Sequence, residues 1–268
     1  MNERRERRPW GRFDWTALAA LVVFGAALRC VGLERLPPAL WFDEGLNGCD
    51  ALTLLRGGPW RLVFPDVFPR EPLLIYLMVP LVKLLGPRTL ALRLASALVG
   101  TAAPLFVYIW LRQAANRRTA LCSAVFLAGM RWHVHFSRIA LRTIWTPTLA
   151  AAAFALLWKA FRSGKRRWAV AAGAVFGLGF YTYLSWYFFI PVVVAGLALG
   201  LWKEGVGDRR RRLTQAGAFG LAATIVAAPM FVHYARFPGD LTGRPEAVSP
   251  FAGGPAAAWA EIAKNAPT

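Results

Sequence analysis

Long apolar runs separated by short basic segments dominate this sequence, and their lengths predict a bundle of membrane-spanning helices. A helix needs about 20 mainly apolar residues to cross the hydrocarbon core of a bilayer. The pattern therefore predicts an all-α, polytopic transmembrane helical bundle of about seven spans. Runs of suitable length lie at 14–33, 91–112, 119–136, 144–161, 168–184, 186–202 and 213–234.

A shorter apolar run, Pro72–Gly86, carries Lys83 near its end. Its length fits a tilted, re-entrant or interfacial helix, or a short extra span. Leu46, Leu52 and Leu55, just upstream, recur at near-helical spacing, which is typical of a helix in the membrane interface. We therefore expect interfacial helices in this part of the chain rather than a further span.

Four clusters of lysine and arginine decide the orientation of the bundle. They lie in the N-terminal tail, in 112–118, in 159–167 and in 203–212. All four fall on one side of the membrane if Pro72–Gly86 does not cross it, and an excess of Lys and Arg marks the cytoplasmic side. The sequence thus predicts a multi-pass protein of the cell membrane with a cytoplasmic N-terminus.

The predicted organisation has three parts. A basic cytoplasmic tail, 1–13, precedes a transmembrane module, 14–235, whose first outer loop covers about 34–90. The remaining segment, 236–268, is expected outside the cytoplasm and ends in a stretch rich in Gly, Pro and Ala. We expect this chain to be the N-terminal part of a longer protein, because no recognisable finishing element follows.

Composition supports a membrane protein and excludes a nucleic-acid-binding one. Hydrophobic residues make up 57% of the 268 residues and charged residues 17%, with 12 Trp and 18 Phe. The formal net charge is +18, but nucleic-acid binding needs basic residues gathered on one soluble face. Here they form short clusters between apolar runs, so membrane lipids are the expected partners.

An acid pair, Asp43 and Glu44 in WFDEG, follows the first span. A carboxylate at the outer rim of the membrane stays hydrated, whereas one in the hydrocarbon centre needs a partner or a water-filled cavity. At the rim it can meet both a water-borne acceptor and the phosphate of a lipid carrier. The pair is therefore a candidate for catalysis, with an N-cap role for Asp43 as the structural alternative.

Two arginines, Arg138 and Arg142 in FSRIALR, lie on the same predicted side. They are four residues apart, which places them on one face if the segment is helical. Guanidinium groups offer paired donors that suit phosphate oxygens, so these two arginines are predicted to hold a lipid phosphate. Snorkelling to lipid headgroups is the alternative.

No metal site is predicted. His133 and His135 point to different faces of a helix, so a shared metal would need another conformation and a third ligand. A divalent ion held by Asp43 or Glu44 stays open, although two adjacent acids do not define a metal site.

Four stretches together resemble the membrane glycosyltransferases of the GT-C fold, in the family related to protein O-mannosyltransferases and aminoarabinose transferases. In chain order they are WFDEG, REPLLIYLMVPLVKLLG, LRLASALVGTAAPLFVYIWLR and FSRIALRTIWTPTL. The resemblance implies transfer of a hexose or pentose from a polyprenyl-phosphate donor to an acceptor hydroxyl on a protein, lipid or glycan, on the extracytoplasmic side.

The resemblance also implies roles for single residues. Asp43 matches the family's catalytic aspartate and Glu44 completes its acid pair. Glu71 falls where the family often has a polar residue before the proline-led helix, and we predict that it contributes to substrate binding. Arg138 matches a recurring loop arginine, and Arg142 is the weaker correspondence. Asp43 would then act as general base while the arginines stabilise the departing phosphate.

One motif departs from the family, because Arg70-Glu71-Pro72 stands where many members have His-Pro-Pro. Two other classes of function remain as alternatives. A transporter or lipid flippase would need polar residues buried in mid-span or broken helices in repeated halves. A non-catalytic membrane assembly module would bind the donor lipid without turnover.

Overall fold

The structure, a computed structural model, describes residues 9–65, 67–202 and 206–242. Within these ranges the regular elements are helices, and the extended pairing is limited to a β-bridge between Phe64 and Arg70. The predicted all-α class is confirmed. The helices are α1 (Arg12–Cys30), α2 (Phe42–Leu55), α3 (Leu73–Leu85), α4 (Thr89–Ala114), α5 (Arg117–Gly129), α6 (Arg131–Arg138), η1 (Arg142–Ile144), α7 (Trp145–Ser163), α8 (Arg166–Leu178), η2 (Gly179–Tyr181), η3 (Leu184–Phe188), α9 (Phe189–Trp202) and α10 (Val206–Arg236).

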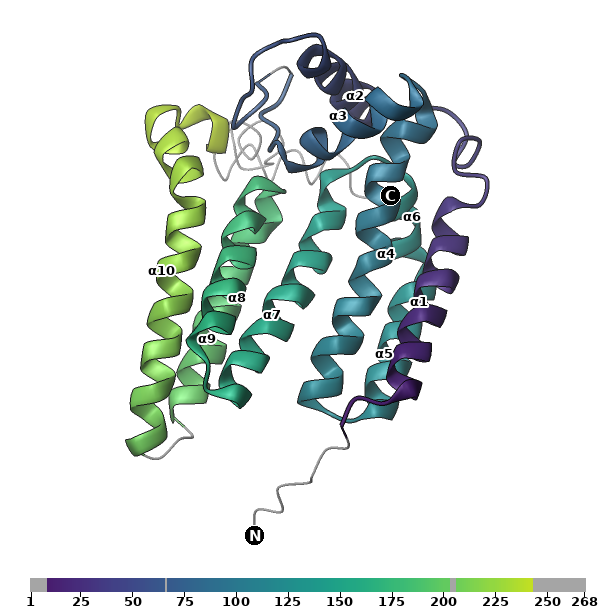
Figure 1. The fold of residues 1–268 in the computed structure, drawn as a ribbon. Helices are drawn as coiled ribbons and strands as arrows, with labels where there is room; N and C mark the ends of the chain where they lie inside the picture. The colour runs from purple at the N-terminus through teal and green to yellow at the C-terminus, as the bar shows by residue number, and fades with distance from the viewer. Residues whose placement is uncertain (1–8, 66, 203–205, 243–268) are drawn as a thin grey trace, which may run out of the picture.

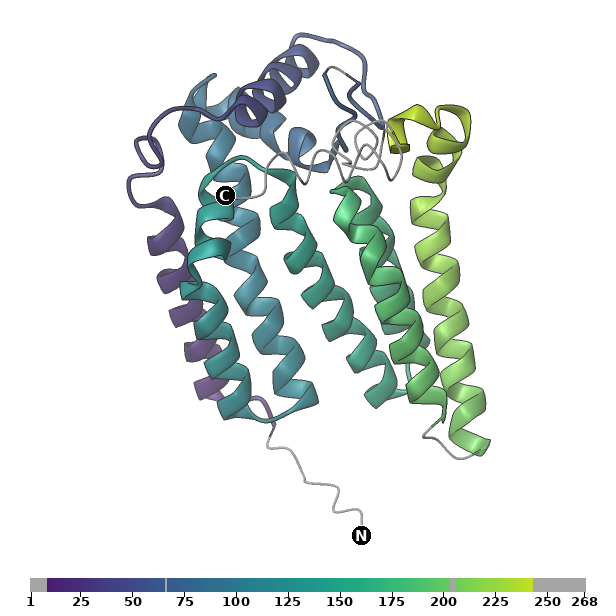
Figure 2. The ribbon, with the colours of Figure 1, turned by 180° about the vertical axis from the view of Figure 1, so that it is seen from behind.

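The long helices stand side by side, and α2 and α3 lie across one end of them (Figure 1). From behind, α5 and α6 follow one another beside α1 and α4 (Figure 2). Helix α4 is central, because it packs against α1, α3, α5, α6 and α7. Its first turns join an apolar cluster with α2 and α3, and its Tyr108 joins another with α1 and α5.

Among the described residues, four helices are long and apolar enough to cross a membrane, which is fewer than the seven predicted spans. They are Arg12–Cys30, Thr89–Ala114, Arg142–Ser163 and Arg209–Arg236. The predicted runs 119–136, 168–184 and 186–202 are also helical, but each is interrupted or short. The first divides into α5 and α6 at Met130, α8 ends at Leu178, and α9 has 14 residues. These helices run alongside the four spans in Figure 1.

Helix α3, at 13 residues, corresponds to the short run Pro72–Gly86. At 1.5 Å per residue it is about 20 Å long, well below the ~30 Å of a hydrocarbon core. It lies with α2 at the end of the bundle (Figure 1), so the chain returns to the same end before α4 begins. This agrees with the prediction that the run does not cross.

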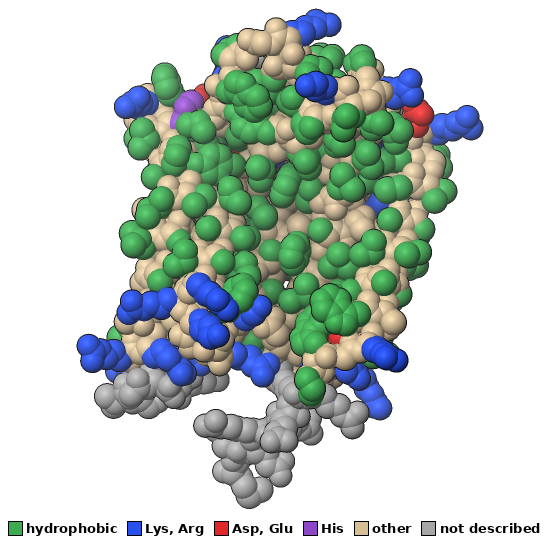
Figure 3. Space-filling view, in the orientation of Figure 1, with side chains coloured by type: hydrophobic (Ala, Val, Ile, Leu, Met, Phe, Trp, Pro, Cys, Tyr) green, Lys and Arg blue, Asp and Glu red, His purple; other side chains and the backbone are tan. Residues whose placement is uncertain are grey.

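The described members of the predicted basic clusters all lie at one end of the bundle, where blue side chains gather in Figure 3. This end holds the start of α1, α5, α8 and α10 and the end of α4 and α7 (Figure 1). We call it the basic end, and the opposite end, with α2 and α3, the loop end. The basic residues concerned are Arg12, Arg112, Arg117, Arg118, Lys159, Arg162, Lys165 to Arg167 and Arg209 to Arg212.

Helices α8 and α10 approach backbone to backbone through two glycines of α8. A Cβ added to Gly173 would lie 2.1 Å from the carbonyl oxygen of Phe219, and one at Gly177 would lie 2.7 Å from that of Ala223. The four-residue spacing puts both glycines on one face, the small-xxx-small arrangement that lets membrane helices pack closely. No larger residue fits at either position without separating the two helices.

Arg93, in the second turn of α4, anchors the segment between α1 and α2 and is 1% exposed. Its Nε and Nη2 donate hydrogen bonds of 2.9 and 3.1 Å to the two carboxylate oxygens of Glu44. Its Nη1 donates to the carbonyl oxygens of Leu33 (3.2 Å) and Pro37 (2.9 Å), and Nη2 also donates to that of Ala39 (2.7 Å). One guanidinium therefore binds both the segment after α1 and the start of α2.

Glu44 is fully buried and accepts two further hydrogen bonds. The backbone N–H of Trp41, the N-cap of α2, donates to Oε2 at 2.9 Å, so Glu44 at the third helical position supplies the glutamate half of a capping box. The backbone N–H of Ala140 donates to Oε1, also at 2.9 Å. The start of α2 is thus fixed against α4 and against the segment that precedes α7.

Replacing Glu44 with glutamine should destabilise the protein strongly, because it leaves the buried cation of Arg93 without its counter-charge. We expect Glu44→Gln to lower the free energy of unfolding by about 3–5 kcal/mol, measured as a lower Tm in detergent. Glu34→Gln, at an exposed acid of the same loop, is the control and should leave Tm unchanged. Equal melting of both variants would contradict this role for Glu44.

Candidate functional site

One face of α2, at the loop end of the bundle, carries a line of polar residues. Asp43, Asn47 and Asp50 are spaced four and three residues apart, which places them on one side of the helix. Asn47 Nδ2 donates to the carbonyl oxygen of Ala140 at 3.1 Å. Arg70 Nη1 lies 2.6 Å from Asp50 Oδ2 and donates to Asn47 Oδ1 at 3.3 Å. This face of α2 therefore contacts the segments that surround residues 70 and 140.

Three of the described carboxylates in α2 and just before α3 pair with a buried arginine. The pairs are Glu44–Arg93, Asp50–Arg70 and Glu71–Arg142. Asp43 differs from all three, since it is partly exposed and makes no hydrogen bond or ion pair with any described residue. It sits in the first turn of α2 but is not its N-cap, which is Trp41. The Asp43 carboxylate is thus available to accept a proton.

Arg70 is 2% exposed and uses part of its donor capacity. Its Nη1 binds Asp50 and Asn47, whereas its Nε and Nη2 have no hydrogen-bond partner within the described part of the chain. A buried donor without a partner is costly and calls for an explanation. Two such nitrogens on one guanidinium match the paired oxygens of a phosphate or carboxylate.

Arg142, in η1, forms a buried ion pair through Nη1 with Glu71 Oε2. The ring of Tyr183 lies beside it, with the guanidinium carbon 5.7 Å from the ring centroid. Tyr187 and Tyr234 lie close enough to Glu71 for its charge to act on both. Arg142 and Glu71 are therefore brought together, and aromatic residues from the turn after α8 and from α10 surround them.

Arg138 takes a different position from Arg142. Its Nη1 donates to the carbonyl oxygen of Leu28 at 2.8 Å, and its Nη2 donates to those of Val31 at 2.8 Å and Leu36 at 3.1 Å. It therefore caps the C-terminal end of α1. Burial lowers the pKa of its guanidinium, but an arginine remains a cation at neutral pH.

The prediction that Arg138 and Arg142 share one helical face is wrong. Helix α6 ends at Arg138, and Ile139 adopts an extended conformation with φ −113° and ψ 144°. The break turns the chain so that Ala140 meets Glu44 and Asn47. The two arginines consequently bind different partners, and a shared phosphate contact stays a prediction.

The described residues do not fit a metal site at the acid pair. Both oxygens of Glu44 accept hydrogen bonds, two of them from the cation of Arg93, so a second cation there would be repelled. His133 Nδ1 lies 2.8 Å from Arg29 Nη2 and serves as its acceptor. Across the described part of the chain, no three His, Cys, Asp or Glu side chains come together as a ligand set.

Sequence reasoning missed Arg93 and Arg70, the arginines that organise the site. Arg93 interrupts the apolar run LALRLASAL near the start of the predicted span 91–112. A charged residue inside a predicted span indicates a buried partner. In the sequence, Arg70 stands out only because Arg70-Glu71-Pro72 replaces the family's His-Pro-Pro motif. The spacing of Glu44 three residues after Trp41 is also informative, because a glutamate at the third position of a helix can accept a hydrogen bond from the backbone N–H of the N-cap residue.

Residues 69–234 match the family of dolichyl-phosphate-mannose-protein mannosyltransferases. No curated protein matches the sequence.

Solved structures share the fold. One is the archaeal oligosaccharyltransferase AglB from Archaeoglobus fulgidus, in complex with an inhibitory peptide and a dolichol-phosphate. It is 17% identical, with a TM-score of 0.68 over 81% of this chain and 29% of its own. Another is the protein O-mannosyltransferase complex Pmt1-Pmt2 of S. cerevisiae bound to the sugar donor, 20% identical, with a TM-score of 0.69 over 85% of this chain and 35% of its own.

These identities show a shared fold, the GT-C fold that the sequence resembles. The chain spans about a third of the length of both structures, 29% and 35%. The family match covers more than half of the 268 residues, and so the chain belongs to the dolichyl-phosphate-mannose-protein mannosyltransferase family.

Proposed function

We propose that this protein transfers a sugar from a polyprenyl-phosphate-linked donor to an acceptor hydroxyl at the loop end of the bundle. Family membership and the fold shared with AglB and Pmt1-Pmt2 support this class of reaction. AglB was solved in complex with an inhibitory peptide and a dolichol-phosphate, and Pmt1-Pmt2 was solved with its sugar donor bound. These complexes support a lipid-linked donor and, more broadly, a protein acceptor. The positive-inside rule supports a cytoplasmic basic end and hence an extracytoplasmic reaction.

The observation that carries the proposal is the contrast between Asp43 and its neighbouring acids. Glu44, Asp50 and Glu71 each form an ion pair with an arginine, while Asp43, at the start of α2, forms none with a residue that the structure describes. A general base must be ionised and within reach of the proton that it removes. Asp43 has no arginine partner among the described residues to occupy its carboxylate oxygens, and its partial exposure gives an acceptor access to them.

In the proposed reaction, Asp43 takes the proton of the acceptor hydroxyl as that oxygen attacks the anomeric carbon. The bond between this carbon and the phosphate oxygen breaks, and the lipid phosphate leaves with the bonding electrons. Donors fixed before the reaction stabilise the charge that develops; Arg142 and Arg138 are the proposed donors, with Glu71 holding Arg142 in place.

We propose a positioning role for Glu44 rather than a role as general base. Its carboxylate is closed off by Arg93, Trp41 and Ala140, so it acts by holding α2 and thereby Asp43 in position. Arg70, with two unpartnered nitrogens, is a further proposed donor to the phosphate. No proposed step uses a metal ion.

The transporter alternative needs charged groups in mid-span. In the described spans, the buried charged side chains lie within the first two turns or the last turn of their helices: Asp14 and Arg29 in α1, Arg93 and Arg112 in α4, and Arg142 at the start of the span Arg142–Ser163. This distribution favours a glycosyltransferase over a transporter.

Asp43→Asn should abolish sugar transfer without unfolding the protein. Loss of a general base typically costs about 10²–10⁴ in rate, and no partner of Asp43 is left unpaired by the change. The measurement is transfer of radiolabelled sugar from membrane polyprenyl-phosphate pools, together with Tm and protein abundance. Glu34→Gln removes the same charge at an exposed site of the same loop and should retain transfer. Wild-type transfer by Asp43→Asn would disprove the assignment.

Arg142→Gln should weaken donor use. Loss of a hydrogen bond to a charged group costs about 1.5–3 kcal/mol, so we expect kcat/KM for the lipid donor to fall by roughly 10- to 150-fold. Arg131→Gln, at an exposed arginine at the start of α6, is the matched control. If both variants used the donor equally well, Arg142 would have no role in binding it.

A further inference from the structure

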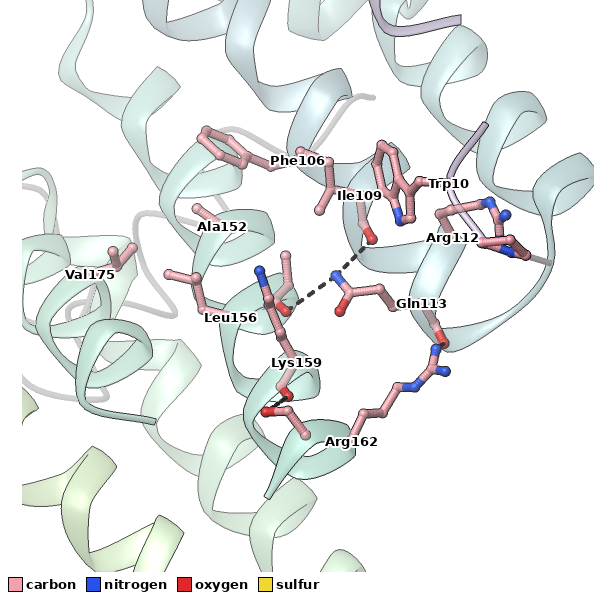
Figure 4. Close-up of a pocket in the computed structure, with 13 residues that line it drawn as sticks. Trp10, Phe106, Ile109, Arg112, Gln113, Ala152, Leu156, Lys159, Arg162 and Val175 are labelled. Carbon is pink, nitrogen blue, oxygen red and sulfur yellow. Dashed lines mark hydrogen bonds between the residues drawn. The ribbon is translucent and has the colours of Figure 1, made fainter. Parts of the chain in front are cut away.

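A cavity lies far from the acid pair, at the basic end, between α4, α7 and α8 (Figure 4). Its volume is about 630 Å³, within the range of about 300–1,000 Å³ typical of small-molecule pockets. Nothing in the proposed reaction uses it. Its deeper wall is apolar and is formed by Phe106, Ile109, Ala152, Leu156 and Val175.

The wall nearest the basic end is polar and cationic. Lys159 and Arg162 lie one turn apart near the end of α7, and Gln113 faces them from the last turn of α4. Figure 4 shows the Lys159 side chain directed into the space between Leu156 and Gln113. The cavity therefore has an apolar interior and a positively charged mouth.

The charges at the mouth are held in place without being neutralised. Lys159 Nζ lies 3.6 Å from the centroid of the Trp168 ring, a cation–π contact that orients an ammonium group but carries no counter-charge. Arg162 Nη1 donates to the carbonyl oxygen of Gln113 at 3.2 Å, a single neutral contact. Neither forms an ion pair with a carboxylate of the described residues.

Among the described side chains, the acid at the basic end is Asp14, and its carboxylate oxygens already accept hydrogen bonds from four donors. It accepts hydrogen bonds from Arg112 (2.8 Å), Arg117 (3.2 Å), Tyr108 (2.7 Å) and the backbone of Gly11 (3.0 Å). Arg112, which also borders the cavity, thus has its counter-charge, whereas the cations of α7 do not.

We propose that this cavity binds an anionic phospholipid of the leaflet at the basic end. The phosphate lies against Lys159 and Arg162, and an acyl chain lies in the apolar interior between α4, α7 and α8. Basic pockets between transmembrane helices are suited to anionic headgroups. A free phosphate would leave the apolar wall without a partner and a neutral lipid would leave the cations without one, so only an anionic amphiphile uses both features.

The test is native mass spectrometry of the purified protein in detergent, titrated with phosphatidylglycerol and with phosphatidylcholine of the same acyl chains. The wild-type protein should retain phosphatidylglycerol preferentially. Lys159→Ala/Arg162→Ala should lower that affinity by roughly 10- to 30-fold, since each basic residue near a headgroup contributes about fivefold. Ala152→Phe, which fills the apolar part without altering charge, should lower it as well.

Arg209→Ala/Arg210→Ala is the control, because it removes the same charge from two exposed residues at the same end of the bundle. It should retain the wild-type preference. Equal loss in this control would show a general surface-charge effect and overturn the site. Equal wild-type binding of both lipids would also overturn it, as would displacement of phosphatidylglycerol by inorganic phosphate at similar concentration. Preferential displacement by a polyprenyl phosphate would assign the cavity to the donor lipid instead and refute the phospholipid.

Discussion

The guanidinium of Arg93 is buried and bound by both oxygens of Glu44 and by three carbonyl oxygens of the segment that follows α1. Burying a charge is costly unless it is paired and its donors are satisfied. Glu44 pairs the charge of Arg93, and the three carbonyl oxygens accept from its remaining N–H groups. The position of α2 across the end of the bundle depends on this contact. Because Asp43 is carried by the first turn of α2, its position depends on the contact too.

Two adjacent acids thus have opposite environments. A helix turns by about 100° per residue, so the rotation that directs Glu44 toward Arg93 directs Asp43 to the edge of the same helix. The buried acid gives a fixed orientation, and the unpaired acid is left for chemistry. The two side chains carry the same carboxylate group, so their different environments result from the face of α2 that packs against α4.

The sequence predicted the helical class, the common side of the basic clusters and the short helix after residue 72, since these follow from hydrophobic run length and charge placement. It overestimated continuity, because local breaks at Met130 and Ile139 are set by tertiary packing and lie within apolar or amphipathic runs. The pairing of Asp50 with Arg70 and of Glu71 with Arg142 joins residues up to 71 positions apart. No local pattern specifies such contacts, and so the partners of the acids emerged only from the fold.

The glycine contact between α8 and α10 has a mechanical consequence for the loop end. Where two backbones touch at Gly173 and Gly177, no flexible side chain lies between them to absorb a displacement. Tyr183 follows α8 and Tyr234 belongs to α10, and both lie beside the Glu71–Arg142 pair. A displacement of α8 at this contact must therefore displace α10 as well, so the parts of the wall that precede Tyr183 and that carry Tyr234 are mechanically coupled.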